Sequence, residues 1–129
     1  LLNPAISTTV PYAKSVAELE MNVRAMTEAY TPLDEKMLYT RSRDIRPYYC
    51  RMCYACRGKC PQGLPVADML RYLAYNDFGC NRAQAHDNFA RLPEEIRRVR
   101  CGDCSPCAIR CPNGVDVRQR LIRAQELLV

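Results

Sequence analysis

Two cysteine-rich runs of identical spacing constrain this sequence more than any other feature. Both read C-x2-C-x2-C-x3-C-P, and equivalent positions lie 51 residues apart. The similarity continues beyond the cysteines, because "CPQGLPVADML" at 60–70 aligns with "CPNGVDVRQRL" at 111–121. The first run contains Cys50, Cys53, Cys56 and Cys60, and the second contains Cys101, Cys104, Cys107 and Cys111. The chain therefore contains a duplicated unit whose fold must accommodate eight closely spaced thiols.

Three kinds of cross-link could use cysteines at this density. Disulfides need partners that face one another, and cysteines three residues apart in a tight loop would form strained bridges. Structural zinc sites are built from C-x2-C pairs separated by a longer spacer, whereas here four thiols come from one run. The observed run is typical of proteins that hold two 4Fe–4S clusters. We therefore predict two such clusters, with a zinc-stabilised binding module as the alternative.

The ligand sets follow from the rule that the fourth cysteine of each run ligates the other cluster. Each cluster with its four thiolates carries a charge of about −2, so two clusters offset most of the formal net charge of +5. This cancellation removes the main argument for a nucleic-acid partner, and we expect none. We assign Cys50, Cys53, Cys56 and Cys111 to cluster 1, and Cys101, Cys104, Cys107 and Cys60 to cluster 2.

Apolar residues at helical spacing follow both motifs and predict helices at 65–76 and 116–128. The inward stripes are Val66, Met69, Leu70 and Leu73 in the first helix and Val117, Leu121, Ala124 and Leu128 in the second. A third helix is predicted over 82–92, with Ala85, Phe89 and Leu92 on one side, after a turn around Asp77–Gly79. No alternating strand pattern separates the motifs, so residues 48–129 are predicted to form a mainly α, α-helical ferredoxin-like domain.

Local signals also mark where the helices begin. Gly63 and Gly114 follow the fourth cysteines and suit a turn with positive φ. Pro65 fits a first helical position and Asp116 an N-cap. The ninth cysteine, Cys80, belongs to neither motif, and we expect a small buried side chain there. The functional roles of Cys80 and of the single histidine, His86, stay open.

Residues 1–47 differ in character from the rest of the chain. "AISTTVPYA" at 5–13 reads as a short β-branched strand, and residues 15–30 as an amphipathic helix with Ser15 as N-cap. A further helix is predicted over 31–38, capped by Thr31. One strand and two helices cannot form a sheet core alone, so we expect this segment to be the end of a larger α/β domain.

This segment resembles a known family. "NPAISTTVPYAKSVAELEMNVRAM" is similar to the last strand and helix of the aldo/keto reductase barrel, with the "PLDEKML" helix after it. The chain as a whole resembles the C-terminal part of aldo/keto reductase-like oxidoreductases that carry a ferredoxin-like extension. The resemblance implies a barrel remnant over 1–47. It also implies contacts to NADP in the full-length protein by Lys14, Ser15, Glu18 and Asn22, although Glu18 stands where Gln is commoner. An ordinary capped surface helix explains these residues equally well.

The resulting functional hypothesis is an electron-transfer module with two 4Fe–4S clusters. The family's catalytic residues would lie upstream of Leu1, so the chain alone is expected to have no catalytic residue, whether it is a fragment or a natural subunit. The expected partner is a redox protein or a fused aldo/keto reductase-like domain; a stand-alone ferredoxin-type subunit is the alternative. No run of 18 apolar residues and no signal peptide is present, so we expect a cytoplasmic protein without a membrane span. The substrate, the electron carrier, the reduction potentials and the oligomeric state do not follow from the sequence.

Overall fold

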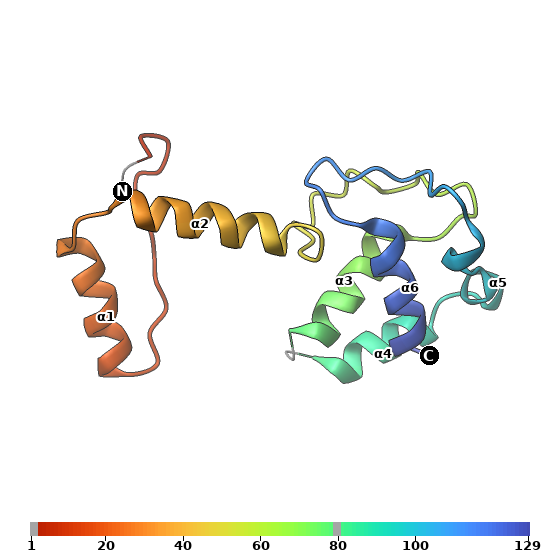
Figure 1. The fold of residues 1–129 in the computed structure, drawn as a ribbon. Coiled ribbons are helices and arrows are strands. Elements are labelled where there is room, and N and C mark those ends of the chain that lie inside the picture. Colours follow the sequence, from red (N-terminus) through yellow and green to blue (C-terminus); the bar gives the residue numbers. More distant parts are fainter. Residues whose placement is uncertain (1–2, 79–80) are drawn as a thin grey trace. The chain divides into compact units, whose positions relative to one another are not determined.

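The structure, a computed structural model, describes residues 3–78 and 81–129 (Figure 1). The chain divides into two compact units, with the boundary between Leu38 and Tyr39. All regular elements among the described residues are helices, as predicted for a mainly α chain. None of these helices is long and apolar enough to cross a membrane. Cys80 and the Gly79 end of the predicted turn lie outside the described residues.

The first unit contains helix α1, Val16–Thr27, and the start of helix α2, Pro32–Ile45. Ser15 is the N-cap of α1 as predicted, and its hydroxyl accepts a hydrogen bond from the Glu18 N–H at 3.2 Å. Thr31 caps α2 in the same way, and Asp34 reaches back to the Thr31 N–H at 2.8 Å. No side chain of α1 is buried, so its apolar stripe is exposed within this unit.

The predicted strand over 5–13 is wrong. Residues 6–13 form no regular secondary structure, and the described part of the chain contains no strand. The physical reason is that an isolated extended segment has no neighbour to receive its backbone hydrogen bonds, and β-branched residues do not replace such a partner. The barrel remnant predicted for 1–47 has no observed sheet to support it.

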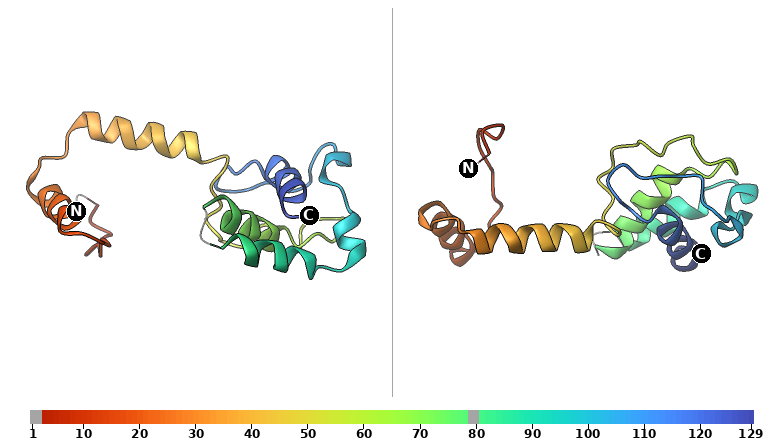
Figure 2. Two further views of the ribbon diagram at one scale, coloured as in Figure 1. Left: turned by 90° about the horizontal axis from the view of Figure 1, so that it is seen from below. Right: turned by 45° about the horizontal axis from the view of Figure 1, so that its top comes forward.

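The second unit is built on three helices: α3, Val66–Asp77; α4, Arg82–Ala90; and α6, Val117–Leu127 (Figures 1 and 2). Helix α3 packs against both α4 and α6. The predicted stripes after the two motifs are confirmed, because all eight of their residues are buried. In α4 Ala85 and Phe89 are buried, whereas Leu92 is half-buried and lies beyond the end of the helix, which stops at Ala90 rather than at the predicted residue 92. Helix α5 (Glu94–Arg98) lies between α4 and the second cysteine run, and a 3₁₀ turn, η1 (Cys101–Asp103), forms the start of that run.

The predicted helix starts are close to those observed. Asp116 is the N-cap of α6, and its carboxylate accepts a hydrogen bond from the Gln119 N–H at 3.1 Å. Pro65 is the N-cap of α3, one residue earlier than the first helical position predicted for it. Gly63 and Gly114 have φ of +74° and +80°, as expected for glycine in these turns.

An ion-pair group joins the end of α3 to α6. The Asp77 carboxylate accepts hydrogen bonds from Arg120 at 2.5 Å and Arg123 at 3.0 Å, and the Arg120 side chain is only 10% exposed. Burial raises the pKa of Asp77, but the hydrogen bonds from Arg123 and Arg120 outweigh this effect and hold the pKa below its usual value of 3.8. The two helices that follow the cysteine motifs therefore share both an apolar core and a charged contact.

Candidate metal centre

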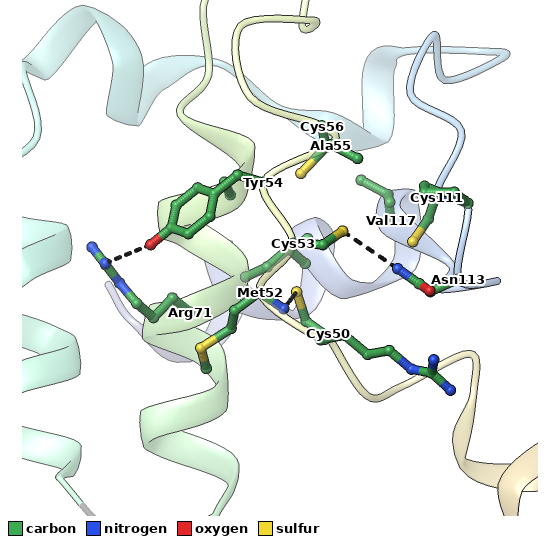
Figure 3. A pocket seen from close by; sticks show the side chains of 14 residues that line it. Cys50, Met52, Cys53, Tyr54, Ala55, Cys56, Arg71, Cys111, Asn113 and Val117 are labelled. Carbon is green, nitrogen blue, oxygen red and sulfur yellow. Dashed lines mark hydrogen bonds between the residues drawn. The ribbon is translucent and has the colours of Figure 1, made fainter. Parts of the chain in front are cut away.

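The first candidate site is a pocket formed by the first cysteine loop and the end of the second (Figure 3). It encloses about 450 Å³ of space, part of it open to solvent. Ala67, Leu70 and Val117 of helices α3 and α6 form its apolar side. Four cysteines line it, three from one run and the fourth from the other: Cys50, Cys53, Cys56 and Cys111.

The second candidate site is a pocket of nearly the same size, about 440 Å³, at the other end of the two loops. Its apolar side includes Leu64, Ile109 and Leu121. Its four cysteines again come from both runs: Cys60, Cys101, Cys104 and Cys107. The structure therefore brings together the same two sets of four that the sequence predicts as ligands, whose ligand role stays a prediction.

The antiparallel course of the two loops explains this pairing. Residues 50–56 lie beside 111–113, whereas residues 60–64 lie beside 101–109. Two long-range hydrogen bonds fix this register at the first site: the Asn113 side-chain amide donates to the Cys53 Sγ at 3.3 Å, and the Asp116 N–H donates to the Pro47 carbonyl at 3.0 Å. Each fourth cysteine therefore lies next to the first three cysteines of the other run.

The backbone of the first loop adopts an unusual conformation. Met52 and Tyr54 have φ of +54° and +58°, a region that costs a residue with a side chain about 1 kcal/mol or more. The Met52 N–H lies 3.4 Å from the Cys50 Sγ and donates to it. The guanidinium of Arg71, on α3, donates a hydrogen bond to the phenol oxygen of Tyr54 at 3.2 Å. Local strain of this kind is found at ligand-binding loops that the surrounding structure holds in place.

The second loop is held from α6. Arg118 donates to the Cys104 carbonyl at 2.9 Å and to the Gly102 carbonyl at 2.7 Å. The buried Gln125 side chain accepts from the Cys101 N–H at 3.0 Å. Each loop is thus fastened by a side chain of a nearby helix, Arg71 for the first and Arg118 for the second. Sequence reasoning missed Arg71, Arg118 and Gln125 because no local pattern distinguishes them from surface residues.

The thiols are free and close enough to influence one another. None of the eight described cysteines forms a disulfide. Burial raises the pKa of Cys101 to about 11, with further contributions from Cys60, Cys104 and Cys107. Burial also raises the pKa of Cys56, with smaller contributions from Cys50, Cys111 and Cys53. The cysteines that raise the pKa of Cys56 and of Cys101 are therefore the other members of the same set of four, while the Arg118 charge lowers the pKa of Cys101.

The donor sets suit a cluster with several metal atoms. A single ion needs its ligand atoms to converge on one point at about 2.3 Å, and among the described residues no three His, Cys, Asp or Glu side chains converge in this way. In a 4Fe–4S cluster the four thiolates bind different irons and need not converge. The residues present match such a cluster in donor type and in the number of thiols at each site.

The four residues that the resemblance associates with NADP lie at the start of α1. Ser15 and Glu18 are used as helix caps, because Glu18 also accepts a hydrogen bond from the Lys14 N–H at 2.5 Å. The Lys14 ammonium lies 5.9 Å from the Tyr12 ring centre, and Asn22 is half-buried one turn further along α1. These contacts account for the capping role of Ser15 and Glu18, while cofactor contact by the four residues stays a prediction.

No family model matches this chain, and no significant match is found among the curated proteins or the solved structures.

Proposed function

We propose that this chain is an iron–sulfur electron-transfer module that binds two 4Fe–4S clusters. The observation that carries the proposal is the division of the eight described cysteines between two pockets, each lined by three thiols of one run and the fourth thiol of the other. Bound clusters of this type exchange single electrons at potentials tuned by hydrogen bonds to sulfur and by solvent exposure. The protein would supply the ligands, the apolar pocket sides and the hydrogen bonds from Met52 and Asn113.

The wider context of the module is proposed on the sequence resemblance alone. In this proposal the chain is the C-terminal part of an aldo/keto reductase-like oxidoreductase, and the clusters exchange electrons with the barrel domain or with a separate redox protein. The cytoplasmic location and the NADP contacts of Lys14, Ser15, Glu18 and Asn22 belong to the same proposal.

Anaerobic purification followed by metal and sulfide analysis tests the cluster proposal directly. Iron and acid-labile sulfide are each expected to reach about eight per chain, because two clusters of four irons are present. The protein should be brown, with a broad visible absorption that dithionite bleaches. Stoichiometric zinc in a colourless protein would contradict the proposal and favour the zinc-stabilised module.

A further inference from the structure

The two candidate sites differ in the solvent exposure of their cysteines, although the spacing of the cysteines is the same in both runs. Cys53 of the first site is exposed, whereas the other seven described cysteines are buried or half-buried. Met52 and Tyr54, on either side of Cys53, are 43% and 45% exposed. At the first site, electron transfer with an outside protein would therefore have its shortest path to the surface through Cys53.

The first loop also carries an excess of positive charge that its duplicate lacks. Between Cys50 and Cys60 lie Arg51, Arg57 and Lys59, all exposed, and no acidic residue. The corresponding segment of the second loop contains one acidic and one basic residue, Asp103 and Arg110. Each loop also accepts a hydrogen bond from an arginine of a nearby helix, the first loop from Arg71 and the second from Arg118. If cations served only to offset cluster charge, both loops would need them equally, so the excess at the first loop requires another explanation.

The exposed side chains around Cys53 have the composition of a protein-binding surface. We define the first-site surface as Arg51, Met52, Tyr54 and Arg57, all exposed and all within the second unit. Tyrosine, methionine and arginine are enriched at protein interfaces. The Arg57 N–H donates to the Tyr54 carbonyl at 2.9 Å, which places the arginine backbone directly beside the aromatic residue. The surface combines two exposed arginines with exposed apolar and aromatic side chains beside the first site.

From these observations, and resting on the proposed function, we propose that the first-site surface is the docking surface for a small acidic one-electron carrier protein. Complementary charge steers such a partner and orients it, and the effect weakens as salt increases. In the docked complex one electron leaves the reduced carrier and enters the first site, with no bond made or broken and no proton transferred. The second site, with its near-neutral loop, would exchange electrons with the first site and not with the carrier.

A binding measurement with charge-reversed variants tests this proposal. An acidic flavodoxin serves as the probe, and its affinity for the cluster-loaded chain is measured by titration calorimetry at about 50 and 200 mM salt. Arg51→Glu/Arg57→Glu is expected to weaken binding about tenfold at low salt, because attraction at two exposed positions becomes repulsion. The matched control, Arg82→Glu/Arg91→Glu at the two ends of α4, changes the net charge equally and should alter the affinity less than about twofold.

A second variant separates the apolar contribution from the charge. Met52→Asn removes the exposed apolar side chain and introduces asparagine, which tolerates the left-handed backbone conformation at this position. It is expected to weaken binding a few-fold without changing the salt dependence. The proposal would be overturned if Arg51→Glu/Arg57→Glu and the control Arg82→Glu/Arg91→Glu lost affinity equally. It would also be overturned if Arg51→Glu/Arg57→Glu changed the reduction potential but not the affinity. Absence of flavodoxin binding to a chain that carries its full iron and sulfide would overturn the docking proposal alone, whereas absence of iron would overturn the proposed function.

Discussion

The exchange of the fourth cysteine between the two runs makes a prediction that paired double variants can decide. The pockets place Cys111 with Cys53 and apart from Cys104, although Cys104 is far closer in sequence. Under the exchange, Cys53→Ser/Cys111→Ser removes two ligands from the same cluster and leaves the other complete. Cys104→Ser/Cys111→Ser removes one ligand from each cluster and leaves neither complete.

The ligand sets determine how much iron and how many intact clusters each double variant should retain. The same-pocket pair should retain about four irons per chain, half of the expected content, in one intact 4Fe–4S cluster. The cross-pocket pair should retain no intact 4Fe–4S cluster, whether each damaged site loses its metal or keeps an incomplete cluster. Electron paramagnetic resonance of the dithionite-reduced protein measures the intact clusters, and chemical analysis measures iron and sulfide. Cys80→Ser is the matched control and should change neither quantity, because Cys80 belongs to neither set.

The opposite pattern would refute the reasoning. If each run of four held its own cluster, Cys104→Ser/Cys111→Ser would remove two ligands from one cluster and leave the other intact. Cys53→Ser/Cys111→Ser would then damage both clusters. The two double variants carry the same number and type of substitutions, so a general loss of folding cannot reverse their order.

Three further outcomes are expected. The cluster at the first site should have the more positive reduction potential in a redox titration, because its sulfurs accept two hydrogen bonds and its loop carries more positive charge. Asp77→Asn should lower the free energy of unfolding by about 2 kcal/mol in urea titrations. This loss should be equal at pH 8 and pH 6 and should shrink only below about pH 4. The native pKa of Asp77 is lowered, so only at such low pH does protonation of Asp77 remove the same contact from the wild type. Gly63→Ala should cost about 1–2 kcal/mol for its positive φ, and Gly114→Ala should cost more by thermal unfolding, because the added methyl group would lie 2.6 Å from Cδ of Arg46.

The sequence was sufficient to predict α3, α4 and α6 because the buried residues of these helices recur with a helical period. Val66, Leu70 and Leu73 recur at the spacing that places one face of a helix inward, and all are buried in α3. Helix α5 was not predicted, although its sequence carries a helix signal: Pro93 precedes two glutamates, and two arginines occupy the last turn. The error over 5–13 has a different origin, because a strand depends on a partner that its own residues do not specify.

The pairing of cysteines was predictable, but the contacts that shape the pockets were not. Motif spacing was enough to group Cys111 with Cys50, since the rule concerns the ligands themselves. The Asn113 amide at Cys53 and the Arg120 contact with Asp77 join residues 60 and 43 positions apart. One sequence contains no periodicity or motif that connects such positions. The charge difference between the two loops can be read from the sequence, whereas the exposure of Cys53 and the hydrogen bonds to its loop appear only in the structure.

Duplication and exchange together tie the core to the metal sites. Helix α3 follows the first run and α6 follows the second, and their apolar stripes are buried against each other. The cysteines are divided in the same way, because each pocket takes its fourth thiol from the other half. One half alone would have three ligands without a fourth and an apolar stripe without its covering helix. Under the proposed function, cluster binding and burial of the helices would therefore support the same arrangement of the two halves, and metal ligation would contribute to folding where the apolar core of the unit is small.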